Sequence, residues 1–164
     1  MKKGILTLFA LALLMPGSWL HAKSKKYDVL VYGATPAGVC AAVAASRDGA
    51  SVALVSPYDY VGGLMSGGLS LSDGNQCVRQ LMGGLFIEVH KRIYEHYADA
   101  GVKLNYKIDL SKNDKWTYEP HVAEKVFHDM IKEVDVTVHL EHQLVGVTKE
   151  STSDCCTAVN ATSS

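Results

Sequence analysis

The residues from Tyr27 to Gly49 read YDVLVYGATPAGVCAAVAASRDG, and this stretch decides the fold. Tyr27 to Tyr32 is nearly all apolar and β-prone, which predicts a strand buried on both faces of a parallel sheet. From Pro36 onward the segment is rich in alanine, a strong helix former. Pro36 itself suits a first helical position, because its missing N–H would have no partner there. The stretch therefore predicts a strand, a tight glycine turn and a helix.

The glycine spacing in the turn is typical of a dinucleotide-binding loop. Gly33 can adopt the tight turn, and Gly38 lets the helix pack close against the strand that precedes it. The N–H groups of the first helical turn, with the positive end of the helix dipole, form a site for phosphate. Gly49 ends the helix, and Ser51 to Val55 reads as a second parallel strand. We therefore expect an α/β fold with a Rossmann-like parallel sheet.

Two positions depart from the usual dinucleotide fingerprint, G-x-G-x-x-G followed by an acid. The middle position is Thr35, which must either point away from a pyrophosphate or donate its hydroxyl to it. The second strand ends at Ser56, where an Asp or Glu normally binds a ribose hydroxyl. Serine can still form a hydrogen bond to a ribose, although a weaker one.

A second glycine-rich segment follows the second strand and reads VSPYDYVGGLMSGGLS. Its two glycine pairs lie in a stretch with neither strand nor helix periodicity, which favours close backbone approach. With the first turn, it resembles the FAD-dependent oxidoreductases of the glutathione reductase-like superfamily, and specifically an exported bacterial subgroup with a G-G-T-P-A-G turn and an H-L-G-G-M-x-T-G-G-L loop. Thr35 is usual in that subgroup, whereas Ser56 replaces the usual acid.

The resemblance continues through Gly83-Gly84-Leu85-Phe86 and Tyr118-Glu119-Pro120-His121-Val122-Ala123-Glu124, so it covers about residues 26 to 148. It implies an FAD cofactor and transfer of a hydride or electron pair between a small organic substrate and the flavin, with substrate and catalytic residues unassigned. The implied cofactor-binding residues are Gly33, Thr35, Pro36, Ala37, Gly38, Ser56, Gly62, Gly63, Met65 and Leu144.

The two ends of the chain have different characters. Lys2 and Lys3 precede an apolar run from Ile5 to Met15, so we expect residues 1–22 to be a signal peptide and the protein to be exported, without a membrane anchor. Residues 23–149 then form the N-terminal part of an FAD-binding domain. The polar segment 150–164 is expected to be disordered or out of frame, because the resembled flavoenzymes are several times longer than these 164 residues.

Between the motifs, periodicity predicts two helices and a pair of strands. Apolar residues at every fourth position predict an amphipathic helix over Val78 to Ala100, and Pro120 opens another. Val136 to Leu140 and Leu144 to Thr148 read as a β-pair. The stretch from Lys107 to Lys115 is polar and reads as a loop.

Other chemistry is disfavoured by the sequence. The seven histidines and four cysteines lack the spacing of a metal site, and His139 and His142 would face opposite ways on an extended strand. His121 is most simply a first-turn residue of a helix, Cys40 a small apolar residue, and Cys77 a candidate partner for Cys155 or Cys156. With 16 basic and 17 acidic residues, the chain has no excess charge to recruit nucleic acid.

Three functions remain open on sequence grounds. The chain is part of a flavoenzyme, a nicotinamide-binding domain, or a non-catalytic secreted remnant. The second glycine loop favours the first over the second, and the absence of an acid at Ser56 disfavours NAD. We expect a chain of this length to bind FAD weakly or not at all, whereas a longer version would purify with the cofactor.

Overall fold

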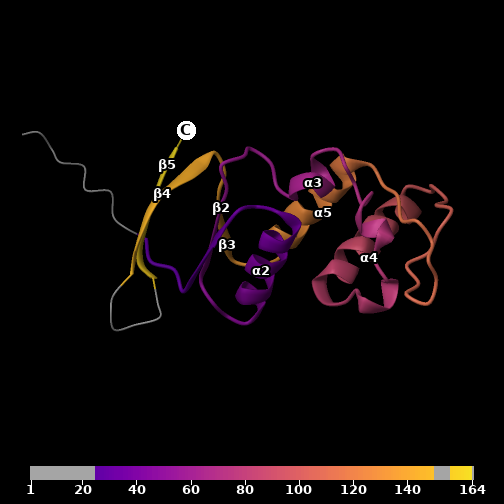
Figure 1. The fold of residues 1–164 in the computed structure, drawn as a ribbon, viewed down its shortest axis with the longest axis horizontal. Helices are drawn as coiled ribbons and strands as arrows, with labels where there is room; N and C mark the ends of the chain where they lie inside the picture. Colours follow the sequence, from indigo (N-terminus) through magenta and orange to yellow (C-terminus); the bar gives the residue numbers. More distant parts are fainter. Residues whose placement is uncertain (1–24, 150–155, 164) are drawn as a thin grey trace, which may run out of the picture.

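The computed structural model describes residues 25–149 and 156–163, so the expected signal peptide lies outside the described residues. Strands and helices alternate along the first half of the chain, as Figure 1 shows. The elements are β1 (Val29–Tyr32), α2 (Pro36–Arg47), β2 (Val52–Val55), α3 (Gly63–Ser66), η2 (Gly74–Gln76), η3 (Arg79–Leu81), α4 (Gly84–Asp99), α5 (Pro120–Lys132), β3 (Val136–His139), β4 (His142–Lys149) and β5 (Cys156–Ser163). Within this part of the chain, no helix has the length and apolar character needed to cross a membrane.

A three-stranded parallel sheet, in the order β1-β2-β3, forms the centre of the fold. In its register, Val52 of β2 lies opposite Val29 of β1 and Val136 of β3. All four residues of β2 are buried, as expected for a central parallel strand. This arrangement confirms the predicted α/β fold with a parallel, Rossmann-like sheet.

The strand β1 is buried on one face only, which corrects the expectation that both faces are covered. Leu30 is 38% exposed and Tyr32 is 45% exposed, whereas Val29 and Val31 are half-buried and pack against the core. Because β1 lies at the edge of the described sheet, it has a hydrogen-bonded neighbour only in β2. In the described structure only Val29 and Val31 of this apolar strand therefore pack against the core.

The helix predicted over Val78 to Ala100 begins later, at Gly84. Residues 79–81 instead form the short 3-10 helix η3, and Leu81, which belonged to the predicted apolar stripe, is 85% exposed. The glycine pair interrupts the periodic pattern, because Gly83 is extended and Gly84 has a φ of +56°. The other predicted helix is confirmed: α5 begins at Pro120, and its apolar face is buried.

The two strands predicted as a pair belong to different sheets. β3 pairs in parallel with β2, and β4 pairs antiparallel with β5. The turn between β3 and β4 passes through Glu141, whose φ of 57° redirects the chain. The strand β5 lies within the segment 150–164, which was expected to be disordered or out of frame. The polar composition of this segment did not predict the strand.

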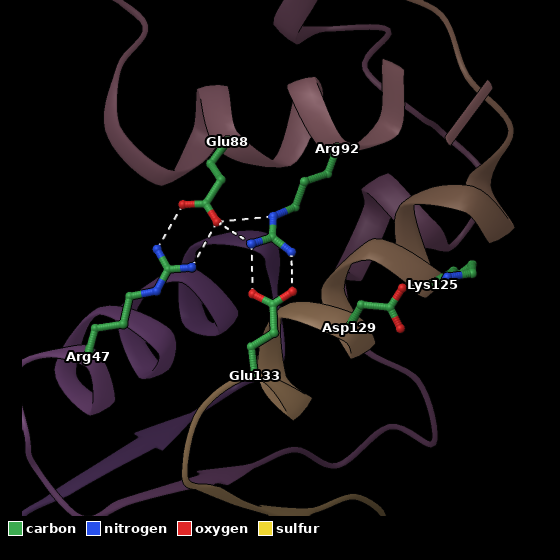
Figure 2. A network of polar contacts seen from close by, with 6 residues as sticks. All are labelled: Arg47, Glu88, Arg92, Lys125, Asp129 and Glu133. Carbon is green, nitrogen blue, oxygen red and sulfur yellow. Dashed lines mark hydrogen bonds and ion pairs between the residues drawn. The ribbon is translucent and has the colours of Figure 1, made fainter. Parts of the chain in front are cut away.

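A chain of alternating charges joins the three long helices (Figure 2). Arg47 of α2 contacts Glu88 of α4 at 2.8 Å through a bidentate pair of hydrogen bonds. Arg92, one turn further along α4, contacts Glu88 at 2.8 Å and Glu133, at the end of α5, at 2.5 Å. Each side chain in this network is partly exposed, so the network orients the helices more than it stabilises them.

The charge network predicts a loss of stability in acid. Hydrogen bonds from Arg47, opposed by partial burial and supported by Arg92, lower the pKa of Glu88 from 4.5 to about 2. A carboxylate with a lowered folded-state pKa stabilises the protein above about pH 4.5, and this stabilisation is lost as the pH falls through about 2. We expect Glu88→Gln to lower the free energy of unfolding by about 1 kcal/mol at pH 7 and by almost nothing at pH 2. Urea titrations across this range measure both values; a difference that does not change with pH would contradict the assignment.

Candidate functional site

The turn between β1 and α2 has the close contacts expected of a dinucleotide loop. Gly33 has a φ of +106°, and its N–H donates to the carbonyl of Val55 at 2.7 Å, which ties the turn to the end of β2. A Cβ built on Gly38 would lie 2.0 Å from the carbonyl oxygen of Gly33. Only glycine therefore fits at position 38, and the helix can begin directly beside the turn.

Thr35 caps α2, a role that sequence reasoning missed. Its Oγ1 accepts a hydrogen bond from the Gly38 N–H at 3.1 Å, so the side chain folds over the start of the helix. Because the Thr35 oxygen accepts this bond, its hydroxyl proton points elsewhere and can be donated to a ligand. A hydroxyl at the N-cap was detectable in the sequence, because Thr35 directly precedes the proline that begins the helix.

The cap leaves few free donors at this helix start. Pro36 has no N–H, the Gly38 N–H is used by Thr35, and the Val39 N–H donates to the Thr35 carbonyl at 2.9 Å. In the ranges that the structure describes, the N–H of Ala37 has no acceptor. This donor and the hydroxyl of Thr35 lie at the positive end of the α2 dipole, which favours an anion.

The second glycine loop packs directly on the first turn. The Gly62 N–H donates to the carbonyl of Ala34 at 2.7 Å, and Gly62 has a φ of +94°. A Cβ on Gly62 would lie 2.5 Å from the ring of Phe127, and one on Gly63 would lie 3.2 Å from Pro36. The structure thus brings together the two glycine segments that the sequence singled out.

Met65 lies beside this junction in an apolar cavity of about 380 Å³. The cavity is formed where α2, α3, α4 and α5 meet and is lined by Pro36, Ala37, Cys40, Met65, Leu85, Phe86, Val89 and Phe127. Cys40 is half-buried there, as expected for a small apolar residue, and its burial raises the pKa of its thiol. With no charged group in its lining, the cavity can hold an apolar group but offers no acid–base chemistry.

Ser56 lies at the carboxyl end of β2 but is only 1% exposed. Its N–H donates to the carbonyl of His139 at 2.9 Å, and its own carbonyl accepts from the His142 N–H at 2.9 Å. Its hydroxyl oxygen accepts from the Tyr58 N–H at 3.3 Å. The role of Ser56 in ribose binding stays a prediction, although its hydroxyl oxygen already has a protein partner.

Leu144, the last predicted cofactor contact, lies on β4 and is 36% exposed. Its N–H donates to the hydroxyl oxygen of Tyr32 at 3.4 Å, which joins β4 to the end of β1. Leu144 thus lies close to the carboxyl ends of the parallel strands, at the edge where ligands of open α/β sheets bind. Its part in cofactor binding stays a prediction.

His139 and His142 lie together, contrary to the expectation for an extended strand. Their ring centroids are 5.4 Å apart, because the chain turns at Glu141 between them. His121 is exposed at the second position of α5. Among the described residues, no group of three His, Cys, Asp or Glu side chains could hold a metal ion.

The expected disulfide of Cys77 with Cys155 or Cys156 can be compared with the structure only at Cys77. Cys77 is an exposed free thiol. The side chains of its candidate partners, Cys155 and Cys156, lie outside the described part.

The parallel sheet, the strand–turn–helix unit and the glycine loop packed on it define a dinucleotide-binding α/β domain. The family model of FAD-dependent oxidoreductases matches residues 28–164, and the chain belongs to this family. The fold is similar to that in the crystal structure of THI4 from Thermovibrio ammonificans, with a TM-score of 0.50 and 14% sequence identity. This similarity covers 96% of the chain and 53% of THI4, so the chain spans about half the length of that protein. No curated protein sequence shows a significant match.

The cofactor of this family, FAD, fits the turn. Gly38 lets the start of α2 pack directly against the Gly33 carbonyl, and the Ala37 N–H and the Thr35 hydroxyl supply donors beside this turn. These are the features that a pyrophosphate requires: close backbone approach, N–H donors and a positive helix end. The family match and the turn thus agree that the cofactor is FAD.

Proposed function

We propose that this chain forms the ADP-binding part of a flavoenzyme of the glutathione reductase-like type. The whole protein transfers a hydride or an electron pair between a small organic substrate and FAD. The single observation that best supports the proposal is the contact between the two glycine segments, in which the Gly62 N–H donates to Ala34. This contact brings both glycine segments to the same turn. A pyrophosphate held by backbone groups requires such a close approach of the chain.

In this proposal the chain's own residues bind and orient the cofactor. Ala37 donates its free N–H to a pyrophosphate oxygen, and Thr35 donates its hydroxyl while it caps the helix. Gly33 adopts the positive φ of the turn, Gly38 lets the helix pack against it, and Gly63 keeps the neighbouring loop close to Pro36. Bound FAD would supply the redox chemistry itself, because its flavin ring can accept a hydride.

We further propose that the protein is exported. The support is the sequence of its first residues, in which two lysines precede an apolar run shorter than a membrane-spanning helix. An exported enzyme would act on a small molecule found outside the cytoplasm.

The proposal is tested by competition between nucleotides for the chain. We expect FAD, detected by its fluorescence, to bind weakly, ADP to displace it, and FMN at the same concentration to leave it bound. FMN is the control because it carries the flavin without the adenosine half. Displacement by FMN but not by ADP would show that the chain recognises the flavin and would contradict the proposal.

A further inference from the structure

The carboxyl end of β2 lacks the acceptor that a ribose needs. In dinucleotide folds this position supplies a carboxylate that accepts hydrogen bonds from the ribose hydroxyls. Here the residue is Ser56, which is almost completely buried and whose hydroxyl oxygen already accepts from the Tyr58 N–H. Because Ser56 is buried, a more exposed acceptor on a neighbouring element is better placed to meet a ribose.

The neighbour that reaches this point is the start of β4. The N–H of His142 donates to the Ser56 carbonyl at 2.9 Å, and the N–H of Glu141 donates to the Tyr58 carbonyl at 3.1 Å. Both bonds fix the turn between β3 and β4 against the end of β2. His142 is half-buried.

The hydrogen bonding of His142 determines which ring nitrogen can accept. Its Nδ1 lies 2.6 Å from the carbonyl oxygen of Leu140. Because a carbonyl oxygen can only accept, Nδ1 carries the proton in this contact, and the lone pair of the neutral imidazole is on Nε2. His142 thus offers one fixed acceptor atom at the edge of the sheet, and the ring of His139 lies 5.4 Å from it, centroid to centroid.

We propose that His142, rather than Ser56, is the positioning residue that accepts a hydrogen bond from the adenosine ribose of FAD. The inference rests on the proposed function, because it assumes that the ADP half occupies the turn at Gly33–Gly38. A ribose hydroxyl donates to Nε2, and the Leu140 carbonyl keeps the imidazole in the tautomer that accepts. The imidazole takes the place of the missing carboxylate by accepting through Nε2.

The test compares ADP with 2′,3′-dideoxy-ADP, which lacks both hydroxyls, by NMR titration of the isotope-labelled chain. We expect ADP to bind the unsubstituted protein about fivefold more tightly than the dideoxy compound, the effect of one hydrogen bond. In His142→Phe this preference should disappear while binding of the dideoxy compound stays unchanged, and His142→Gln, whose amide oxygen can accept, should restore part of it. His96→Phe, on the distant helix α4, is the matched control and should keep the full preference.

Equal weakening of both nucleotides by His142→Phe, or no weakening, would overturn the inference. The imidazole nitrogen signals of His142 in the unsubstituted protein decide the question even if a variant does not fold. They should move when ADP is added and not when the dideoxy compound is added. ADP binding that lacks these effects rejects only the role of His142, whereas failure of ADP to bind at all rejects the proposed function as well.

Discussion

Replacing Gly38 with alanine should weaken nucleotide binding more than tenfold. The added Cβ would lie 2.0 Å from the Gly33 carbonyl oxygen, a backbone atom that cannot move without opening the turn. Relief of this overlap must shift either the end of β1 or the start of α2, and both hold the pyrophosphate site. We expect the affinity for ADP to fall more than tenfold and the free energy of unfolding to fall by about 1–3 kcal/mol. Titration with ADP and urea unfolding measure the two effects separately.

Gly83→Ala is the matched control for this substitution. Gly83 is extended, precedes α4 and has no heavy atom within 4 Å of a built Cβ. The substitution should leave ADP affinity and stability nearly unchanged. Unchanged ADP affinity in a folded Gly38→Ala protein would show that the turn is not the nucleotide site.

The largest loss of stability is expected from Arg79→Met. Arg79 is 1% exposed, and among the described residues its hydrogen-bond acceptors are carbonyl and amide oxygens. Its Nη1 donates to the Gly74 carbonyl at 2.9 Å, and its Nη2 donates to Asn75 Oδ1 at 2.7 Å and to the Asp114 carbonyl at 3.0 Å. The guanidinium also lies 4.8 Å from the ring centroid of Trp116. One side chain thus joins the loop before α4 to the loop before α5.

Methionine can fill the space but can make none of these three hydrogen bonds. Asn75 Oδ1 keeps the Trp116 N–H and the Gly74 carbonyl keeps the Cys77 N–H, whereas the Asp114 carbonyl loses its bond from Arg79. At about 1 kcal/mol for each lost hydrogen bond of a buried charged group, we expect the free energy of unfolding to fall by about 3 kcal/mol. Arg47→Met is the control, because its ion pair is 37% exposed on the arginine side and should contribute about 1 kcal/mol or less. Urea unfolding of both variants gives the comparison; equal losses would show that Arg79 does not organise the loops.

The sequence predicted the parts of the fold that depend on local patterns. Gly33, Pro36 and Gly38 fix the turn and the start of α2 through short-range sterics, so their arrangement could be read directly. The start of α5 at Pro120 was predictable for the same reason. These elements required no knowledge of distant partners.

The errors arose where distant residues decide the structure. β3 pairs with β2 across about 80 residues of chain, and no local pattern distinguished this pairing from a hairpin with β4. The burial of Arg79 depends on carbonyl groups about 35 residues away, near Asp114, and this contact holds residues 79–81 outside the helix that follows. His90 is likewise a buried core residue, whose pKa burial lowers to about 4, although it was one of seven histidines without a distinctive pattern.

The candidate site was predictable to a similar extent. The glycines were identified from their spacing, but the capping bond from Gly38 to Thr35 and the approach of His142 to Ser56 depend on atoms that the sequence does not place. The departure at Ser56 was visible in the sequence. The residue that could replace the missing acid was not, because it lies on an element that reaches Ser56 only through the turn at Glu141.

The central claim is that FAD binds at the turn between β1 and α2. The most direct test is a titration of the ¹⁵N-labelled chain with FAD, because amide signals report weak binding residue by residue. We predict that the signals of Thr35, Ala37 and Gly38 move most, followed by that of Gly62, which is bonded to the turn. Changes confined to other residues, with the three turn amides unmoved at saturating FAD, would contradict the account.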